Sequence, residues 1–182
     1  MSEVVVADAN VLVPASLCDI LLRAFAAGLY QLRWTEDILD EVYRTLINDL
    51  NKSDAQARRR IEAMKRAFPD AMITSHRHLI DAMTNSPKDR HVLATAVEAA
   101  ARVILTNNLR DFPAESLSPH GIVAESPDIF LLRLARRDTG AVVAIIHEQA
   151  QGLQSPPMSV SGVLSALAVQ APRFVSQVSP FV

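Results

Sequence analysis

The feature that most constrains the fold is the segment 86–112, SPKDRHVLATAVEAAARVILTNNLRDF. It opens with a helix-start signal, continues as a helix rich in Ala, Val and Leu, and passes into a β-branched apolar run at 102–106 that predicts a buried strand. A helix of about 14 residues is about 21 Å long, and a strand of about five residues covers about 17 Å. If the strand doubles back on the helix, Asp111 returns close to Asp89. The segment therefore predicts two acids facing one cleft.

The composition is that of an ordinary globular protein with a sizeable core. The chain has 182 residues, of which 49% are hydrophobic and 21% are charged, and we expect one domain with a small appendage. A single cysteine, Cys18, excludes an intramolecular disulfide and the usual Cys-based metal sites, and it fits a reducing cytoplasm. We expect no signal peptide and no membrane span, because no basic leader and no long uncharged apolar run is found. The net charge of −2 argues against a protein that coats nucleic acid.

Strand and helix patterns alternate along most of the chain, which predicts an α/β sandwich with a parallel sheet. Apolar runs suited to strands lie at 3–7, 30–34, 102–106 and 121–124. The composition shifts near residue 138, and helical patterns follow. We therefore predict a domain over residues 1–137 and a C-terminal helical extension over residues 138–182.

Four acids form the candidate site: Asp8, Glu41, Asp89 and Asp111. Asp8 and Asp111 come after predicted strands, and ligands of open α/β sheets bind outside the carboxyl ends of the strands. Asp89 lies near the start of its helix on the same face as apolar residues. Glu41 borders the apolar face of its own helix.

Each acid also has an ordinary explanation. Asp8 suits a turn after a strand, Asp111 suits a loop, Glu41 could pair with Arg44 on the surface, and Asp89 could complete a helix cap begun by Ser86. The functional interpretation depends on their joint placement. Two carboxylates about 5 Å apart repel by about 3 kcal/mol at an effective dielectric constant of about 20. An all-oxygen cluster of this kind suits Mg²⁺ or Mn²⁺.

The other motifs carry less chemistry. The five histidines show no zinc-binding spacing, and a surface or structural role is favoured for His91. No phosphate-cradling or nucleotide-binding glycine motif is found. The basic run at residues 58–60 is interpreted as a solvated helix face, with contact to RNA or an acidic partner as the alternative.

Four segments together resemble the PIN domain: VADANVL, ILDEVYR, PKDRHVLATA and VILTNNLRDF. They look most like the VapC-type ribonuclease toxins of bacterial toxin–antitoxin pairs. The resemblance covers roughly residues 3–134, and the tail resembles a C-terminal extension found in one subgroup of these proteins.

The resemblance implies a three-layer α/β/α fold with a parallel central sheet and an acidic Mg²⁺ or Mn²⁺ site. Asp8, Glu41, Asp89 and Asp111 match the metal-binding and catalytic acids of the family. Many PIN domains carry their fourth acid where this chain has Asn108, so Asp111 would serve in its place. The residues that match the family's polar supports are Asn10, Thr106 and Asn107.

The function implied by the resemblance is metal-dependent endoribonuclease activity, as the toxin of a toxin–antitoxin pair in the cytoplasm. Its partners would be an RNA substrate, a cognate antitoxin protein and a second copy in a homodimer. Two alternatives stay open from the sequence. One is a PIN nuclease that acts in RNA processing or repair, and the other is a PIN-like binding module without catalytic activity.

Overall fold

A computed structural model describes residues 2–153 and 156–182. The chain divides into two compact units, and each is described by itself. The first comprises Met1–Val13 and Tyr30–Glu125, and the second comprises Pro14–Leu29 and Ser126–Val182.

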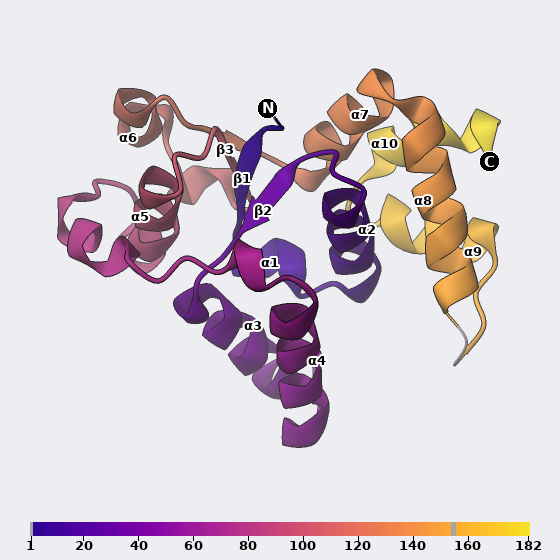
Figure 1. Cartoon of the computed structure of the whole chain (residues 1–182), viewed down its shortest axis with the longest axis horizontal. Coiled ribbons are helices and arrows are strands. Elements are labelled where there is room, and N and C mark those ends of the chain that lie inside the picture. Colours follow the sequence, from indigo (N-terminus) through magenta and orange to yellow (C-terminus); the bar gives the residue numbers. More distant parts are fainter. Residues whose placement is uncertain (1, 154–155) are drawn as a thin grey trace. The chain divides into compact units, whose positions relative to one another are not determined.

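The first unit contains the sheet (Figure 1). Its strands and α-helices are, in chain order, β1 (Val4–Ala7), α1 (Ala9–Leu12), β2 (Gln31–Arg33), α3 (Glu36–Asn48), α4 (Asp54–Ala67), α5 (Arg90–Glu98), β3 (Val103–Leu105), α6 (Ala114–Leu117) and β4 (Val123–Glu125). Its short 3₁₀ helices are η1 (Pro69–Ala71), η2 (His76–Ala82), η3 (Pro87–Asp89), η4 (Leu109–Asp111) and η5 (Ser118–His120).

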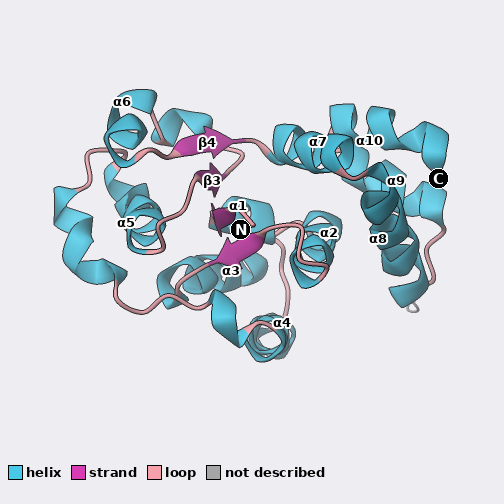
Figure 2. Ribbon diagram, turned by 45° about the horizontal axis from the view of Figure 1, so that its top comes forward, coloured by secondary structure: helices cyan, strands magenta, loops and turns pink. Residues whose placement is uncertain are grey.

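Within the described residues, the strands form one four-stranded sheet in the order β2-β1-β3-β4, and all neighbouring pairs are parallel (Figure 2). Val5 pairs with Leu32 of β2 on one side and with Val103 of β3 on the other. The chain leaves β1 toward β2 and leaves β3 toward β4, so its connections diverge between β1 and β3. This arrangement confirms the predicted α/β/α fold with a parallel central sheet, and it creates a topological switch point between the two inner strands.

The apolar sequence of the inner strands fits their burial. Val5, Val6 and the three residues of β3 are buried, as expected for parallel strands that are covered on both faces. Helix α5 packs on β1 and β3, and its Val92 and Leu93 are fully buried. This packing positions the N-terminal end of α5 at the edge of the sheet where β1 and β3 end.

Helices α3 and α4 both begin at residues of a type that favours helix N-termini, and both have their capping contacts. The hydroxyl of Thr35 accepts a hydrogen bond from the backbone N–H of Ile38 at the start of α3. Ser53 and Gln56 form the reciprocal capping box that opens α4. Helices α3 and α4 pack side by side (Figure 1).

Two local predictions differ from the structure. The segment after Ser86 begins as the 3₁₀ helix η3, and α5 starts only at Arg90; in the part of the chain that is described, the Ser86 side chain makes no cap hydrogen bond. The alternative role of Asp89 as a partner in a Ser86 cap therefore lacks its hydrogen bond. The sequence of residues 71–74, Ala-Met-Ile-Thr, also predicts a short strand, but the structure has a single bridge there, between Trp34 and Met72.

The second unit is helical. Its elements are α2 (Ala15–Ala26), α7 (Pro127–Arg137), α8 (Thr139–Gly152), α9 (Val160–Ala168), α10 (Pro172–Val178) and the 3₁₀ helix η6 (Ser179–Phe181). Helix α2 packs against α8 and α9, and α10 packs against α7. The buried side chain of Gln149 donates a hydrogen bond to the backbone carbonyl of Ser16, which ties α8 to α2. The predicted domain boundary between residues 137 and 138 stays a prediction.

None of the helices in residues 2–153 and 156–182 has the length and apolar character needed to cross a membrane.

Candidate active site

The site is built on the ends of the two inner strands. Asp8 follows β1 and Thr106 follows β3, so both lie at the carboxyl edge of the sheet, at the switch point. The backbone N–H of Asp8 donates to the carbonyl of Leu105, at 2.9 Å, which continues the strand pairing by one residue. The register of the sheet therefore fixes the two side chains next to each other.

A hydrogen-bond network holds the carboxylate of Asp8. The hydroxyl of Thr106 donates to Asp8 Oδ2 at 2.7 Å, and Asn10 Nδ2 donates to the same oxygen at 2.6 Å. The backbone N–H of Asn107 donates to Asn10 Oδ1 at 2.9 Å, and the N–H of Asn108 donates to Thr106 Oγ1 at 3.0 Å. The structure thus brings together Asp8 and all three predicted polar supports.

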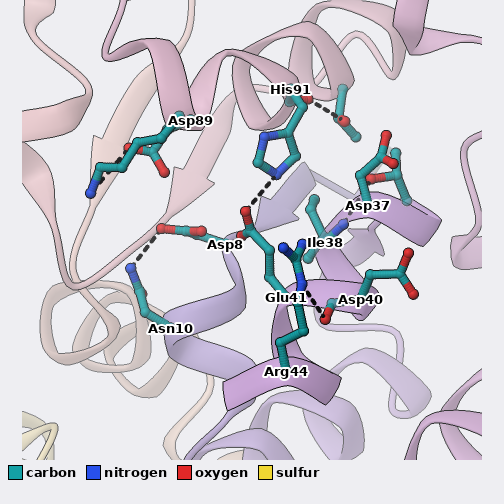
Figure 3. Close-up of polar contacts among 12 residues, drawn as sticks. Asp8, Asn10, Asp37, Ile38, Asp40, Glu41, Arg44, Asp89 and His91 are labelled. Carbon is teal, nitrogen blue, oxygen red and sulfur yellow. Dashed lines mark hydrogen bonds and ion pairs between the residues drawn. The ribbon is translucent and has the colours of Figure 1, made fainter. Parts of the chain in front are cut away.

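A cleft of about 490 Å³ opens beside this network. Its lining includes three of the four predicted acids and two basic residues: Asp8, Glu41, Asp89, Lys88 and Arg44. Figure 3 shows Asp8, Glu41 and Asp89 approaching one another from three different elements. The acids therefore converge although they are far apart in the sequence.

Burial opposes the ionisation of the two inner acids. It raises the pKa of Asp8, and the hydrogen bond from Thr106 offsets part of that effect. It raises the pKa of Asp89 to about 6; the ammonium of Lys88 lowers this pKa, while the charges of Asp8 and Asp111 raise it further. Asp89 Oδ2 is buried and has no hydrogen-bond partner among the described residues. The inner cleft thus holds negative charge that the protein compensates only in part.

Asp111 lies beside Asp89 but has different surroundings. Lys88 Nζ is 2.9 Å from Asp111 Oδ2 and 3.7 Å from Asp89 Oδ2. Asn108 Nδ2 also donates to Asp111 Oδ2. The hydrogen bond from Lys88 lowers the pKa of Asp111, and a hydrogen bond with Ser86 acts in the same direction. Two donors therefore compensate the charge of Asp111, and Asn108 is one of them.

Glu41, which lines the cleft, faces His91 (Figure 3). His91 Nε2 lies 3.6 Å from Glu41 Oε1, which is ion-pair distance but beyond a geometric hydrogen bond. Burial alone would lower the pKa of His91, but the interaction with Glu41 outweighs it and the pKa is raised. The sequence did not reveal this contact, nor the contacts of Lys88. For the contact between Glu41 and His91, the signal in the sequence was the position of His91, two residues after Asp89 at a helix start.

The donor set fits a hard divalent cation. Asp8 and Asp89 are buried carboxylates whose repulsion a cation would relieve, and the unpartnered Asp89 Oδ2 is an available ligand atom. Over the residues that are described, no group of three Asp, Glu, His or Cys side chains is close enough to hold a metal ion unaided. Mg²⁺ commonly binds through one or two carboxylates, with water and substrate phosphate as its other ligands, so two protein ligands suffice for it.

Comparisons with known proteins agree with this geometry. A family model described as "PIN domain" matches residues 4–110, and one described as "VapC50 C-terminal domain" matches residues 127–180. Over 107 residues the chain is 40% identical to a protein of Mycobacterium tuberculosis named "Putative ribonuclease VapC50". That alignment covers 59% of this chain and 63% of the relative, so it spans somewhat less than two thirds of the relative's length.

Proposed function

The chain belongs to the PIN-domain family, and from that premise we propose that it is a metal-dependent endoribonuclease, the toxin of a toxin–antitoxin pair. The observation that carries the proposal is the pair of buried carboxylates, Asp8 and Asp89, that face one cleft at the switch point of the sheet. The relative from Mycobacterium tuberculosis is named as a ribonuclease, which supports the same activity.

Asp8 and Asp89 would hold the ion directly, with Glu41 and Asp111 as the outer members of the predicted acid set. When bound, Mg²⁺ or Mn²⁺ supplies positive charge for the scissile phosphate and lowers the pKa of water. Thr106 and Asn10 keep the Asp8 carboxylate in one orientation, and preorganisation of this kind improves both affinity and catalysis.

The reaction is hydrolysis of a phosphodiester. The oxygen of water attacks phosphorus in line with the leaving 3′ oxygen, the P–O3′ bond breaks, and the 3′ oxygen takes up a proton. The products are a 5′-phosphate and a 3′-hydroxyl. Glu41 is suited to accept the proton of the attacking water or to orient that water, because it lines the cleft and its Oε1 faces His91 Nε2.

The partners are those that the resemblance to VapC-type toxins implies. The substrate is RNA, and the antitoxin would lie across the cleft, where an arginine from it could reach the acids. We also propose that the protein acts in the cytoplasm and as a homodimer. Growth arrest on expression, relieved by co-expression of a small neighbouring gene, is expected for a toxin and not for a nuclease of RNA processing or repair.

The test is cleavage of RNA with Mg²⁺ or Mn²⁺, with a chelator, and with the variant Asp8→Asn. We expect the chelator and the variant each to lower the cleavage rate by at least 100-fold, because both remove the charge that stabilises the transition state. The exposed Asp70→Asn is the matched control and should cleave like the wild type. Undiminished cleavage by Asp8→Asn would contradict the assignment of Asp8 to the metal site of the nuclease. A wild-type chain that binds metal but never cleaves would indicate the inactive binding module.

A further inference from the structure

The geometry points to Lys88 as a phosphate-binding residue for RNA at the rim of the cleft, with Asp111 as the anchor that positions it and not as a metal ligand. The inference rests on the proposed function, because it names a residue that would hold the substrate of that same site.

Lys88 projects its ammonium group between two acids. It belongs to η3, directly before Asp89, and its Nζ lies 2.9 Å from Asp111 Oδ2 and 3.7 Å from Asp89 Oδ2. The side chain is 67% exposed, yet it lines the cleft that contains Asp8, Glu41 and Asp89. An ammonium group has three N–H donors, and only the contact with Asp111 is within hydrogen-bond distance. Lys88 can therefore hold Asp111 and still present a donor to a ligand.

The contacts of Asp111 favour an anchoring role. Its Oδ2 receives Lys88 Nζ and Asn108 Nδ2, and its backbone carbonyl accepts a hydrogen bond from the N–H of Ser86 at 3.3 Å. Asp111 is not part of the cleft lining, whereas Lys88 and Asn108 are. A metal ion could reach Asp111 Oδ2 only by displacing the two donors that cover it. Asp89, by contrast, lines the cleft with a buried oxygen that has no partner among the described residues.

The charge balance of the cleft explains why a cation at the rim would help. Three carboxylates line the cleft, and RNA carries a negative charge on every phosphate. A bound metal ion would neutralise the phosphate that reacts, and a cation at the rim would offset the charge of a neighbouring phosphate. The basic residues of the lining are Lys88 and Arg44, and Arg44 is already turned to the backbone carbonyl of Asp40. Lys88 is thus the better placed of the two to contact a phosphate, as a point charge with rotatable donors.

A different role for Lys88 would leave a different signature. The ammonium could be a stand-in for the metal ion, which must be displaced before the ion binds. In that case removal of the ammonium would tighten metal binding and leave RNA binding unchanged. A phosphate-binding role predicts weaker RNA binding and nearly unchanged metal affinity. Measurements of both affinities on the same variants therefore separate the two roles.

The first arm measures binding of a short fluorescent RNA by anisotropy, with Ca²⁺ in place of Mg²⁺, on Lys88→Met, Lys88→Arg and Asp111→Asn. We expect Lys88→Met to weaken binding about 10-fold and to reduce the slope of log affinity against log salt by about one contact. Lys88→Arg should restore most of the affinity, because it keeps the charge. Asp111→Asn should weaken RNA binding about 3-fold to 10-fold, because the ammonium loses its anchor. The exposed Lys52→Met is the control and should bind like the wild type.

The second arm measures Mg²⁺ affinity by calorimetry and needs no RNA. We expect Asp89→Asn to lose at least 10-fold in affinity, and Asp111→Asn and Lys88→Met to change by less than about 3-fold. Equal losses in Asp89→Asn and Asp111→Asn would overturn the anchoring role. Unchanged RNA affinity in Lys88→Met would overturn the phosphate-binding role. If the wild type fails to bind or cleave RNA, the proposed function fails and the RNA part of the inference with it, while the Mg²⁺ titrations still decide whether Asp111 is a ligand.

Discussion

Asp89 is the acid in the cleft whose charge the fold opposes most clearly. Only 12% of its side chain is exposed, and burial raises its pKa to about 6 although Lys88 lies 3.7 Å away. Because the pKa is raised in the folded state, the protonated form of Asp89 is the one that the fold favours. The stability that this group contributes is fully present below the ordinary pKa of about 4 and is lost as the pH rises through about 6.

We therefore expect Asp89→Asn to stabilise the metal-free chain at pH 8. The free energy of unfolding should rise by about 1 kcal/mol, a discounted value because solvent screens part of the interaction. The gain should shrink toward zero as the pH falls from about 6 to about 4, since the wild-type carboxyl then carries its proton. Urea denaturation in a chelator at several pH values measures it.

The exposed Asp81→Asn provides the baseline for that experiment and should show no such pH-dependent gain. Added Mg²⁺ should stabilise the wild type and not Asp89→Asn, because the variant lacks the charge that binds the ion. A gain of the same size at pH 4 and pH 8 would contradict the assigned cause.

Thr106 donates a hydrogen bond to Asp8, the second buried acid of the cleft. Its hydroxyl donates to Asp8 Oδ2 at 2.7 Å and accepts the N–H of Asn108, so Thr106→Val removes a donor from a carboxylate that is already buried. We expect Mg²⁺ affinity to fall about 10-fold, as is typical when a residue that supports a metal ligand is lost. Isothermal calorimetry measures this affinity.

Thr95→Val is a matched control for that variant. Thr95 is also fully buried, but its hydroxyl donates to the helix carbonyl of His91, and among the described residues it has no hydrogen bond to an acid of the site. Its Mg²⁺ affinity should stay within a factor of two of the wild type, and equal losses in both variants would show that the effect comes from general loosening of the core.

The sequence predicted the residues of the site better than their contacts. Asp8, Asp89 and Glu41 could be identified because strand ends and helix starts can be located from the local pattern. The register of β1 and β3 then places the ends of these strands side by side at the cleft. The contacts of Lys88 could not, because residues 87–89 form a 3₁₀ turn and not the first turn of an α-helix. A 3₁₀ helix has three residues per turn in place of 3.6, which changes the direction of each side chain. The metal-binding and catalytic roles of the four acids stay predictions.

At the scale of elements, long and strongly patterned segments were the predictable ones. The four strands and the helices α2, α3, α4 and α7 follow from β-branched runs, from caps at Thr35 and Ser53, and from apolar stripes. Helices α1 and α6 have four residues each, which is about one turn and too short to show a periodic pattern. Their formation depends on tertiary contacts that no local pattern carries.

Helix α1 has such a contact in Arg60 of α4. The guanidinium of Arg60 donates to the backbone carbonyl of Val13 at 2.9 Å and to that of Leu12, and these are carbonyls at the C-terminal end of α1 that its own turn leaves unpaired. Because α1 carries Asn10, which donates a hydrogen bond to Asp8, this contact stabilises a helix that contributes to the network around Asp8.

We expect Arg60→Ala to lower the free energy of unfolding by about 1.5–3 kcal/mol, the range for hydrogen bonds to a charged group, as measured by urea denaturation. The neighbouring Arg59→Ala has the same change of helix propensity at an exposed position and should stay within about 0.5 kcal/mol of the wild type. Equal losses in the two variants would show that the contact with α1 contributes nothing.

At the scale of the whole molecule, the division of the chain could not be seen in its linear order. Residues 14–29 lie between β1 and β2 in the sequence, yet they belong to the second compact unit with residues 126–182. Composition and periodicity predict α2 as a helix but not which helices it packs against, because an apolar stripe does not specify its partner. The pairing of α2 with α8 and α9 became visible only in three dimensions.

This pairing predicts the outcome of a truncation. A chain that ends at residue 125 keeps α2, whose buried residues include Leu17, Cys18 and Leu21, but loses α8 and α9, the two helices that α2 packs against. Loss of Gln149 also removes the donor to the carbonyl of Ser16. We expect the truncated chain to expose a large apolar surface and to aggregate, which size-exclusion chromatography and binding of a hydrophobic dye would detect.

A chain that lacks only residues 181–182 is the control for this truncation. Phe181 and Val182 are 58% and 37% exposed, so their removal uncovers little of the core, and the shortened chain should elute and melt like the wild type. If the chain that ends at residue 125 is monodisperse and binds no more dye than the control, α2 does not need the helices of residues 126–182. The apolar face of α2 would then have to be covered in another way, and residues 1–125 would fold as an independent domain.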